Sequence, residues 1–201
     1  MNSSIKDKIT KKMAAAGLSV AASLSAGYLL IPHEGEVKNS KGEHVVYLDP
    51  VGIPTFCWGL TGKDMYGKFP KVGDTYTDQE CEIMFSERVR HFEKAVDRNV
   101  SVKYASVFQK AALISFTYNV GEGALASSTL LRELNKGNHE EACDQLLRWI
   151  YAKGIVLPGL KNRRGEERDW CSGDAPYEAT ATVFSLSSTI IKETYTINNS
   201  Q

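Results

Sequence analysis

Residues 44–62 read HVVYLDPVGIPTFCWGLTG, a stretch in which β-branched and aromatic residues flank turn-forming residues. Segments 44–47 and 54–58 are rich in the residue types that favour extended strands. Between them, Asp49-Pro50-Val51-Gly52 is typical of a tight turn, since Pro restricts φ and Gly accepts a positive φ. The stretch therefore predicts two short strands joined by a turn, a small β-hairpin element.

Helical patterns dominate the chain after Pro70. Residues 77–80, Thr-Asp-Gln-Glu, match a capping box, and a more apolar helix is expected from about Tyr104 to Asn119 as a core helix. Further helices are expected at 128–136, 139–152 and 162–171. The fold class is therefore α+β, a small β-hairpin element in a mostly helical body. The first of these helices is indicated by apolar residues at helical spacing: Cys81, Met84, Phe85, Val89, Phe92 and Val96.

The charge balance argues against one class of partner. The chain of 201 residues, enough for one sizeable core, carries 24 Lys and Arg against 24 Asp and Glu. A net charge of zero argues against nucleic-acid binding, which requires a basic surface. The first twelve residues hold four Lys and one Asp, so they carry +3 and the remainder carries −3.

An uncharged run of 19 residues, Met13–Ile31, follows this basic start. As a helix rising about 1.5 Å per residue, it would nearly span the ~30 Å hydrocarbon core of a bilayer. The lysines before it would keep the amino-terminal end in the cytoplasm. Yet 11 of the 19 residues are Ala, Gly or Ser, so a bilayer would hold the segment weakly.

Three interpretations of Met13–Ile31 compete. A removed signal peptide needs small residues at its cleavage site, and Ser23-Leu24-Ser25 would serve. A buried amphipathic helix fits least well, because the run lacks a polar stripe and follows four lysines. A temporary anchor fits best, because the run is long enough to span a membrane but only weakly apolar. We therefore expect a signal-anchor helix in residues 1–32, a folded domain at 33–174 and a C-terminal extension at 175–201 that holds no recognisable motif.

Glu34, Asp49 and Thr55 supply the groups that glycoside hydrolysis requires. One carboxylic acid must protonate the leaving oxygen, a second carboxylate must stay ionised, and a hydroxyl can hold the attacking water. A partly desolvated site would raise the pKa of Glu34, as a general acid needs. Taken singly, each residue has an ordinary alternative: a solvated surface Glu, an Asp that starts a turn, and a strand Thr.

A series of short motifs gives these three residues a context. In order they are HEG at 33–35, YLDPVGIPT at 47–55, WGLTG at 58–62, YNVG at 118–121, STLLR at 128–132 and GLKNRRxxE at 159–167. With them the chain resembles the phage-type, T4-like lysozymes over about residues 34–171. Within that family it is most similar to the signal-anchor-release endolysins of lambdoid phages.

The resemblance implies a lysozyme-like fold and a muramidase activity. Such enzymes cleave the β-1,4 bond between N-acetylmuramic acid and N-acetylglucosamine in peptidoglycan, without a metal or other cofactor. The family's acid, carboxylate and threonine correspond to Glu34, Asp49 and Thr55, and inversion would need carboxyls roughly 6.5–9.5 Å apart. Matching segments also place three residues where they would line the glycan cleft: Leu60, Asn119 and Arg163. For Asn119 and Arg163 a helix cap and a salt bridge remain alternatives.

The resemblance also implies where the protein acts. We expect a monomer whose partners are peptidoglycan and, through the amino-terminal segment, the bacterial inner membrane. The protein would be tethered there first and would enter the periplasm after release, for lysis of the host cell.

Two features depart from the family pattern. Between Glu34 and Asp49 lie 14 residues, more than the family has, and segment 38–43 is expected to be a lengthened polar hairpin tip. Glu36 and Glu43 thereby become rival acids, but Glu34 keeps the Glu-Gly pair and the family's position before the hairpin. In addition, Met13–Ile31 contains no Cys, so a thiol in the anchor cannot control activation.

The four cysteines leave two interpretations open. They are either buried free thiols or two disulfides with three connectivities, and an oxidising periplasm would favour pairing. None forms a C-x-x-C pair.

Other functions fit the sequence less well. A zinc amidase needs clustered His ligands, but the four His have no ligand spacing. No motif marks an activated thiol for a Cys/His peptidase. The rival from another class is a catalytically inactive, membrane-anchored peptidoglycan-binding or lysis-accessory protein, and a membrane-disrupting protein is a further alternative.

Overall fold

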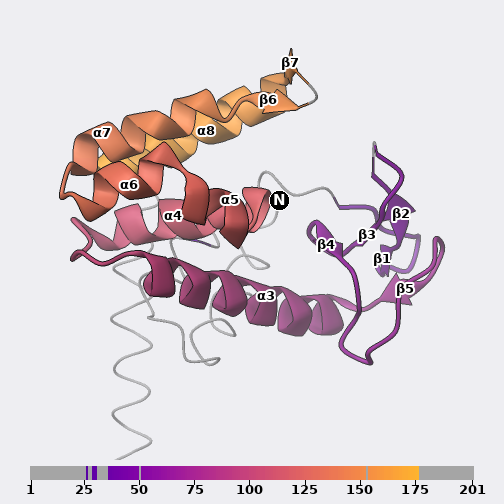
Figure 1. Ribbon diagram of the computed structural model, residues 1–201. Coiled ribbons are helices and arrows are strands. Elements are labelled where there is room, and N and C mark those ends of the chain that lie inside the picture. The colour runs from indigo at the N-terminus through magenta and orange to yellow at the C-terminus, as the bar shows by residue number, and fades with distance from the viewer. Residues whose placement is uncertain (1–25, 27–28, 31–35, 50, 153, 177–201) are drawn as a thin grey trace, which may run out of the picture.

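The computed structural model describes residues 26, 29–30, 36–49, 51–152 and 154–176 (Figure 1). Short antiparallel strands form a small lobe near the start of this range. β1 (His44–Val45) pairs with β5 (Thr75–Tyr76), while β2 (Tyr47–Leu48), β3 (Pro54–Phe56) and β4 (Leu60–Thr61) form a second sheet in that order. The predicted hairpin is confirmed: Tyr47 opposes Thr55 across β2 and β3. β4 and β5 add pairing that the sequence did not predict.

The polar segment 38–43 forms the predicted hairpin tip. Lys38 and His44 make an antiparallel bridge, and the N–H of Val45 donates to the carbonyl of Val37 at 2.8 Å. Asn39 closes the tip, because its Oδ1 accepts from the backbone N–H groups of Lys41 and Glu43. The added residues therefore extend the hairpin at its tip.

Helix α3 (Asp78–Asn99) begins in the small lobe and continues along the helical body (Figure 1). Its start is the predicted capping box, in which Thr77 Oγ1 accepts from the N–H of Glu80 and the Glu80 carboxylate accepts from the N–H of Thr77. Helix α4 (Val107–Val120) buries residues on all sides, so the predicted core helix is confirmed.

The rest of the body is helical with one interruption. Its helices are α5 (Glu122–Ser127), α6 (Thr129–Asn135), α7 (His139–Asp144), the short 3-10 helix η2 (Gln145–Arg148) and α8 (Pro158–Ser172). The single helix predicted over 139–152 is wrong. Its second half is η2 and the strand β6 (Tyr151–Ala152), which pairs with β7 (Ile155–Val156).

This misprediction has a local cause. Residues 149–151 are aromatic or β-branched, which favours extended backbone, and Gly154 adopts a φ of +78°. Helix α8 also begins earlier than predicted, because Pro158 suits the first turn of a helix, where no N–H partner is needed.

One hydrophobic core joins the two parts of the molecule. A path of aromatic contacts runs from His44 to Trp58, Phe85 and Tyr118, with ring centroids 4.9–5.7 Å apart. Buried residues of the predicted anchor belong to the same core: Ala26, Leu29 and Leu30. The remainder of that segment, Glu34 and residues 177–201 of the predicted extension lie outside the described residues. No helix among the described residues is long and apolar enough to span a membrane.

All four cysteines are paired in disulfides. Cys57 bonds Cys81 and Cys143 bonds Cys171, with sequence separations of 24 and 28 residues. The pairing interpretation is therefore confirmed, and one of the three connectivities is realised. Cys57–Cys81 ties the end of β3 to α3, whereas Cys143–Cys171 ties α7 to α8.

We predict that the two disulfides stabilise the fold similarly but affect activity differently. Removing either pair by a double Cys→Ser change should lower the free energy of unfolding by about 2–4 kcal/mol, because each closes a loop of similar length in the unfolded chain. Only loss of Cys57–Cys81 should also reduce turnover of the folded enzyme, because Cys57 is two residues from Thr55. Urea unfolding and murein digestion of both variants test this; equal turnover would contradict the second part.

Candidate active site

Asp49 and Thr55 meet at the turn between β2 and β3. The backbone N–H of Asp49 and the hydroxyl of Thr55 both donate to the carbonyl of Ile53, each at 3.0 Å. Asp49 Oδ1 accepts from the N–H groups of Val51 and Ile53 at 2.9 and 2.8 Å. The two residues therefore meet at one carbonyl, Asp49 from the turn after β2 and Thr55 from β3, in the turn-and-strand arrangement that the sequence predicted.

These hydrogen bonds determine what the two groups can offer a ligand. The hydroxyl of Thr55 gives its hydrogen to Ile53, so Oγ1 remains an acceptor toward a water molecule. Thr55 is only 5% exposed, which fixes its rotamer. The carboxylate of Asp49 is half-buried, and backbone N–H groups orient it through one oxygen. This part of the hairpin thus offers a ligand both an acceptor for a water and a carboxylate.

The predicted acid, Glu34, lies outside the described residues, but both rival acids are described. Glu36 forms an ion pair with Lys38, Oε1 to Nζ 2.9 Å. Glu43 accepts a hydrogen bond from Asn39 Nδ2 at 2.8 Å, within the hairpin tip. Both carboxylates are thus partnered within the hairpin that precedes the Asp49 turn.

A cluster around His44 is the one group among the described residues whose geometry could hold a cation. Its ligand atoms come from Glu36, His44 and Asp78 and lie within 4.8 Å of one another. Lys38 Nζ lies 2.9 Å from the carboxylate of Glu36 and 2.7 Å from that of Asp78, so an ammonium already supplies positive charge there. Burial would lower the pKa of Lys38, but its hydrogen bonds to Asp78 and Glu36 outweigh that effect and raise it.

The buried His44 also belongs to this cluster. Burial lowers the pKa of His44, although the hydrogen bond from the ring to Asp78 Oδ1 at 2.8 Å acts in the opposite direction. The cluster thereby ties the hairpin 36–44 to the first turn of α3.

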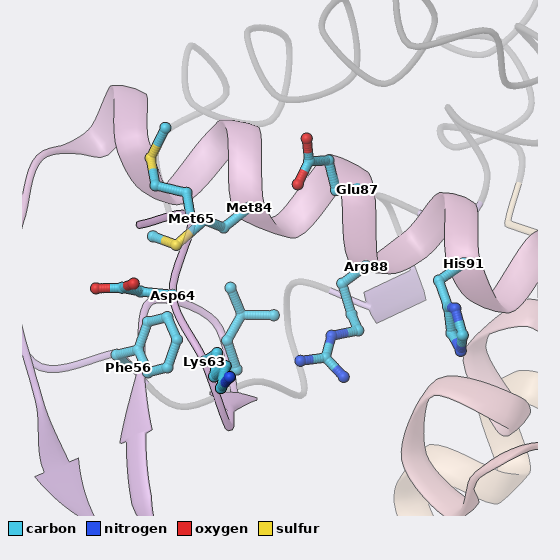
Figure 2. A pocket seen from close by; sticks show the side chains of 9 residues that line it. Phe56, Lys63, Asp64, Met65, Met84, Glu87, Arg88 and His91 are labelled. Atoms are coloured by element: carbon cyan, nitrogen blue, oxygen red, sulfur yellow. The ribbon is translucent and has the colours of Figure 1, made fainter. Parts of the chain in front are cut away.

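An open hollow of about 260 Å³ lies between α3 and the small lobe (Figure 2). Figure 2 shows Arg88 and His91 projecting from α3, with Phe56, Lys63 and Asp64 on the side of the small lobe. Both cationic and anionic groups line this hollow, together with sulfur and aromatic side chains. The lining residues are Phe56, Leu60, Lys63, Asp64, Met65, Met84, Glu87, Arg88 and His91.

A second hollow, of about 300 Å³, adjoins the first and brings two predicted site residues together. Leu60 and Asn119 both line it, and Leu60 and Arg88 are shared with the first hollow. Arg88 stands at the boundary, where its Nη2 donates to the carbonyl of Thr61 at 2.8 Å. Arg88 could not be predicted as a site residue from the sequence, since a lone Arg on a helix carries no motif. We call this second hollow the Asn119 hollow.

A third hollow, of about 420 Å³, lies among the helices. Its lining is mostly hydroxyl, amide and aromatic: Ser127, Ser128, Thr129, Gln145, Arg148, Trp149 and Tyr151. Hydroxyl, amide and aromatic groups suit sugar binding, because they combine hydrogen bonds with a flat apolar surface. Ser128 and Thr129 belong to the STLLR motif, but no role was predicted for any of these residues, partly because 145–151 was expected to form a continuous helix.

Arg163, the third predicted cleft residue, lies in a buried ion-pair network. It is 4% exposed, its Nε lies 3.1 Å from Glu167 Oε1, and its Nη2 donates to the carbonyl of Ser115. Arg164 also pairs with Glu167, Nε to Oε2 2.9 Å, and both of these residues are fully buried. The salt-bridge alternative for Arg163 is therefore present in the structure.

Asn119 joins this network to the hollow. Its Oδ1 accepts a hydrogen bond from Arg164 Nη2 at 2.9 Å, while the Asn119 side chain lines the hollow beside Leu60. Arg164 belongs to the motif at 159–167, but spacing alone does not distinguish its role from that of its neighbour Arg163.

Comparison with known proteins identifies the family of this site. The chain matches the Phage lysozyme family model over residues 38–167. The SAR-endolysin of Bacteriophage PS119 is 38% identical over 159 residues, 76% of this chain and 92% of that protein. The SAR-endolysin of Enterobacteria phage P21 is 35% identical over 161 residues, 80% and 94% of the two chains. The solved endolysin from Escherichia coli O157:H7 phage FAHEc1 has a TM-score of 0.65 at 29% identity, covering 76% and 94%. The chain therefore belongs to the phage lysozyme family of glycoside hydrolases, as its motifs predicted.

Proposed function

We propose that the protein is an endolysin that hydrolyses the β-1,4 bond between N-acetylmuramic acid and N-acetylglucosamine in the host's peptidoglycan. The observation that supports this most strongly is the turn on which Asp49 and Thr55 share the carbonyl of Ile53. A carboxylate and a hydroxyl on either side of one carbonyl fit water-mediated glycoside cleavage, and Phe56, next to Thr55, lines the hollow between α3 and the small lobe. Membership of the phage lysozyme family supports the same substrate.

In the proposed mechanism Glu34 is the general acid and protonates the leaving sugar oxygen. The carboxylate of Asp49 stays ionised and stabilises positive charge that develops on the sugar ring. A water molecule that donates a hydrogen bond to Thr55 Oγ1 attacks the anomeric carbon from the opposite face of the ring. The configuration at that carbon is thereby inverted. The Asp49 carboxylate is ionised until this step, when it takes up the proton that the water loses. No metal takes part in these steps.

The glycan is proposed to lie along the hollows on either side of Leu60. Leu60 would contact an apolar sugar face and Asn119 a polar substituent. Arg163 is buried and directs its Nε at Glu167 and its Nη2 at Ser115, so we assign it a supporting role behind the cleft. These roles rest on placement in the structure and on the matching motifs.

Digestion of purified peptidoglycan tests the proposal against its rivals. The muramidase should release reducing sugar ends at a rate proportional to enzyme concentration. A catalytically inactive wall-binding protein would pellet with the peptidoglycan without releasing such ends. A membrane-disrupting protein would release dye from vesicles and leave the peptidoglycan intact.

We further propose that residues 1–32 are a signal-anchor that tethers the enzyme to the inner membrane before its release into the periplasm. The names of the relatives from phages PS119 and P21 support this, as does the weak hydrophobicity of Met13–Ile31. Ala26, Leu29 and Leu30 are buried in the protein's own core, an arrangement that suits the released enzyme and not one with this segment in a bilayer. These three residues follow Ser25, so their burial leaves both cleavage and intact release compatible with the proposal.

The tethered enzyme is predicted to be inactive. Glu34 is three residues past Ile31, so a segment held in the bilayer would keep the acid from the Asp49 turn. Intact-mass measurement on membrane and periplasmic fractions, with peptidoglycan digestion by each, checks this. A full-length mass in the active soluble fraction indicates release, and a mass lacking about 25 residues indicates cleavage. Activity of the membrane-integral form would contradict the prediction.

A further inference from the structure

The side-chain amide of Asn119 could in principle face the hollow with either its oxygen or its nitrogen. The oxygen only accepts hydrogen bonds, whereas the NH₂ group only donates them. Arg164 decides between the two, because a guanidinium has donors and no acceptor. Its Nη2 lies 2.9 Å from Asn119 Oδ1, so the oxygen must face Arg164.

Arg164 is itself held in place from several directions. It is fully buried, its Nε lies 2.9 Å from Glu167 Oε2, and its guanidinium carbon lies 5.1 Å from the centre of the Phe116 ring. Burial lowers the pKa of Arg164 to about 10, with Glu167 opposing and Arg163 adding to that shift, so the group remains charged at neutral pH. A rotated Asn119 amide would direct its NH₂ group at this fixed cation and lose the hydrogen bond. The orientation of the amide is therefore fixed.

With its oxygen held by Arg164, Asn119 has its NH₂ group available to a ligand. Asn119 is exposed and lines the hollow beside Gly59, Leu60 and Thr61. A sugar hydroxyl can donate or accept, so a fixed donor selects weakly for hydroxyls. A carbonyl oxygen only accepts, and peptidoglycan carries one on the 2-acetamido group of each sugar.

We propose that Asn119, positioned by Arg164, is a specificity-determining residue that donates a hydrogen bond to the acetamido carbonyl of a bound sugar. This assignment rests on the proposed function. Asn119 contacts substrate, and Arg164 acts only through Asn119 as a positioning residue. The enzyme should consequently prefer N-acetylated glycan over the same glycan with free amines.

The N119D variant tests the assignment with little change of shape. One carboxylate oxygen keeps the partner Arg164, while the NH₂ donor is replaced by an acceptor. On peptidoglycan, kcat/KM should fall roughly tenfold to hundredfold, because the acetamido carbonyl loses its donor and faces an oxygen. On chemically de-N-acetylated peptidoglycan, the kcat/KM of wild type should be lower than on N-acetylated peptidoglycan by a similar factor. The kcat/KM of N119D should differ little between the two substrates. For each protein, the decisive readout is the ratio of kcat/KM on N-acetylated peptidoglycan to kcat/KM on de-N-acetylated peptidoglycan.

Two companion variants separate this role from a general effect on charge or folding. N162D makes the same change at an exposed position of α8 and should retain the wild-type ratio. R164M should lower the ratio if its circular dichroism and thermal midpoint show a folded protein, because the Asn119 amide is then free to rotate. Should R164M not fold, N119D alone decides.

The possible outcomes show separately whether the role of Asn119 or the proposed muramidase function is wrong. An active wild type whose N-acetyl preference survives in N119D would overturn the role of Asn119 and leave the muramidase intact. A folded wild type that releases no reducing ends from peptidoglycan would overturn the proposed function and, with it, this assignment.

Discussion

Replacing Glu34 by Gln should abolish nearly all turnover while the protein keeps its fold. Gln has almost the same shape but cannot give a proton to the leaving sugar oxygen, and general acid catalysis contributes about 10²–10⁴-fold. Initial rates of reducing-end release from purified peptidoglycan measure the loss. Circular dichroism should match wild type, because Gln has almost the same shape as Glu.

Glu36→Gln and Glu43→Gln are the matched controls, because these are the two nearby carboxyls that could replace Glu34 as the acid. Glu36 is paired with Lys38 and Glu43 with Asn39, so neither change should reduce turnover more than a few-fold. Near-complete loss in either control, with activity retained in the Glu34 variant, would assign the acid to another residue.

Of the single substitutions predicted for this protein, Glu167→Gln should destabilise the fold most. It should lower the free energy of unfolding by about 3–5 kcal/mol. Glu167 is fully buried and is the shared counter-charge of Arg163 and Arg164, with a further hydrogen bond from Ser115 Oγ at 2.7 Å. Without its charge, the buried guanidinium groups of Arg163 and Arg164 would lose the carboxylate that they share. The free energy of unfolding, from urea titration, measures the effect.

Glu122→Gln supplies the comparison for this prediction. Glu122 also pairs with an arginine, Arg98, at 2.8 Å, but both side chains are exposed. Water screens such a pair, so its loss should destabilise the protein far less than the loss of the buried Glu167 carboxylate. Equal destabilisation by the two changes would show that burial of the Glu167 network contributes little.

Local signals predicted the elements whose stability is local. The capping box at Thr77 was enough to predict α3, and the apolar run of α4 was enough to predict the core helix. Both signals depend only on residues that are close together in the sequence. The turn at Asp49 gave the hairpin in the same way. By contrast, β5 depends on a partner far away in the sequence, because Thr75–Tyr76 pairs with His44–Val45. No pattern within a two-residue strand reveals such pairing.

In the candidate site, too, local features could be predicted from the sequence, whereas features that depend on tertiary packing could not. Asp49 and Thr55 follow from one turn, so sequence placed them together, and the Asn119 hollow contains two of the three residues predicted for the cleft. The separate contributions of Arg163 and Arg164 could not be predicted. Adjacent residues on a helix point in different directions, and only the packing of α8 against α4 decides which guanidinium reaches Asn119. Disulfide connectivity was open for the same reason, since it depends on distances in space.

The measurement that tests the whole account most directly is peptidoglycan digestion in ¹⁸O-labelled water, followed by mass spectrometry of the fragments. If Thr55 and Asp49 direct a water at the sugar after Glu34 protonates the leaving oxygen, every new reducing end should be an N-acetylmuramic acid carrying one ¹⁸O. Fragments ending in unlabelled anhydro-sugars, or in reducing N-acetylglucosamine, would contradict hydrolysis of the muramidase bond.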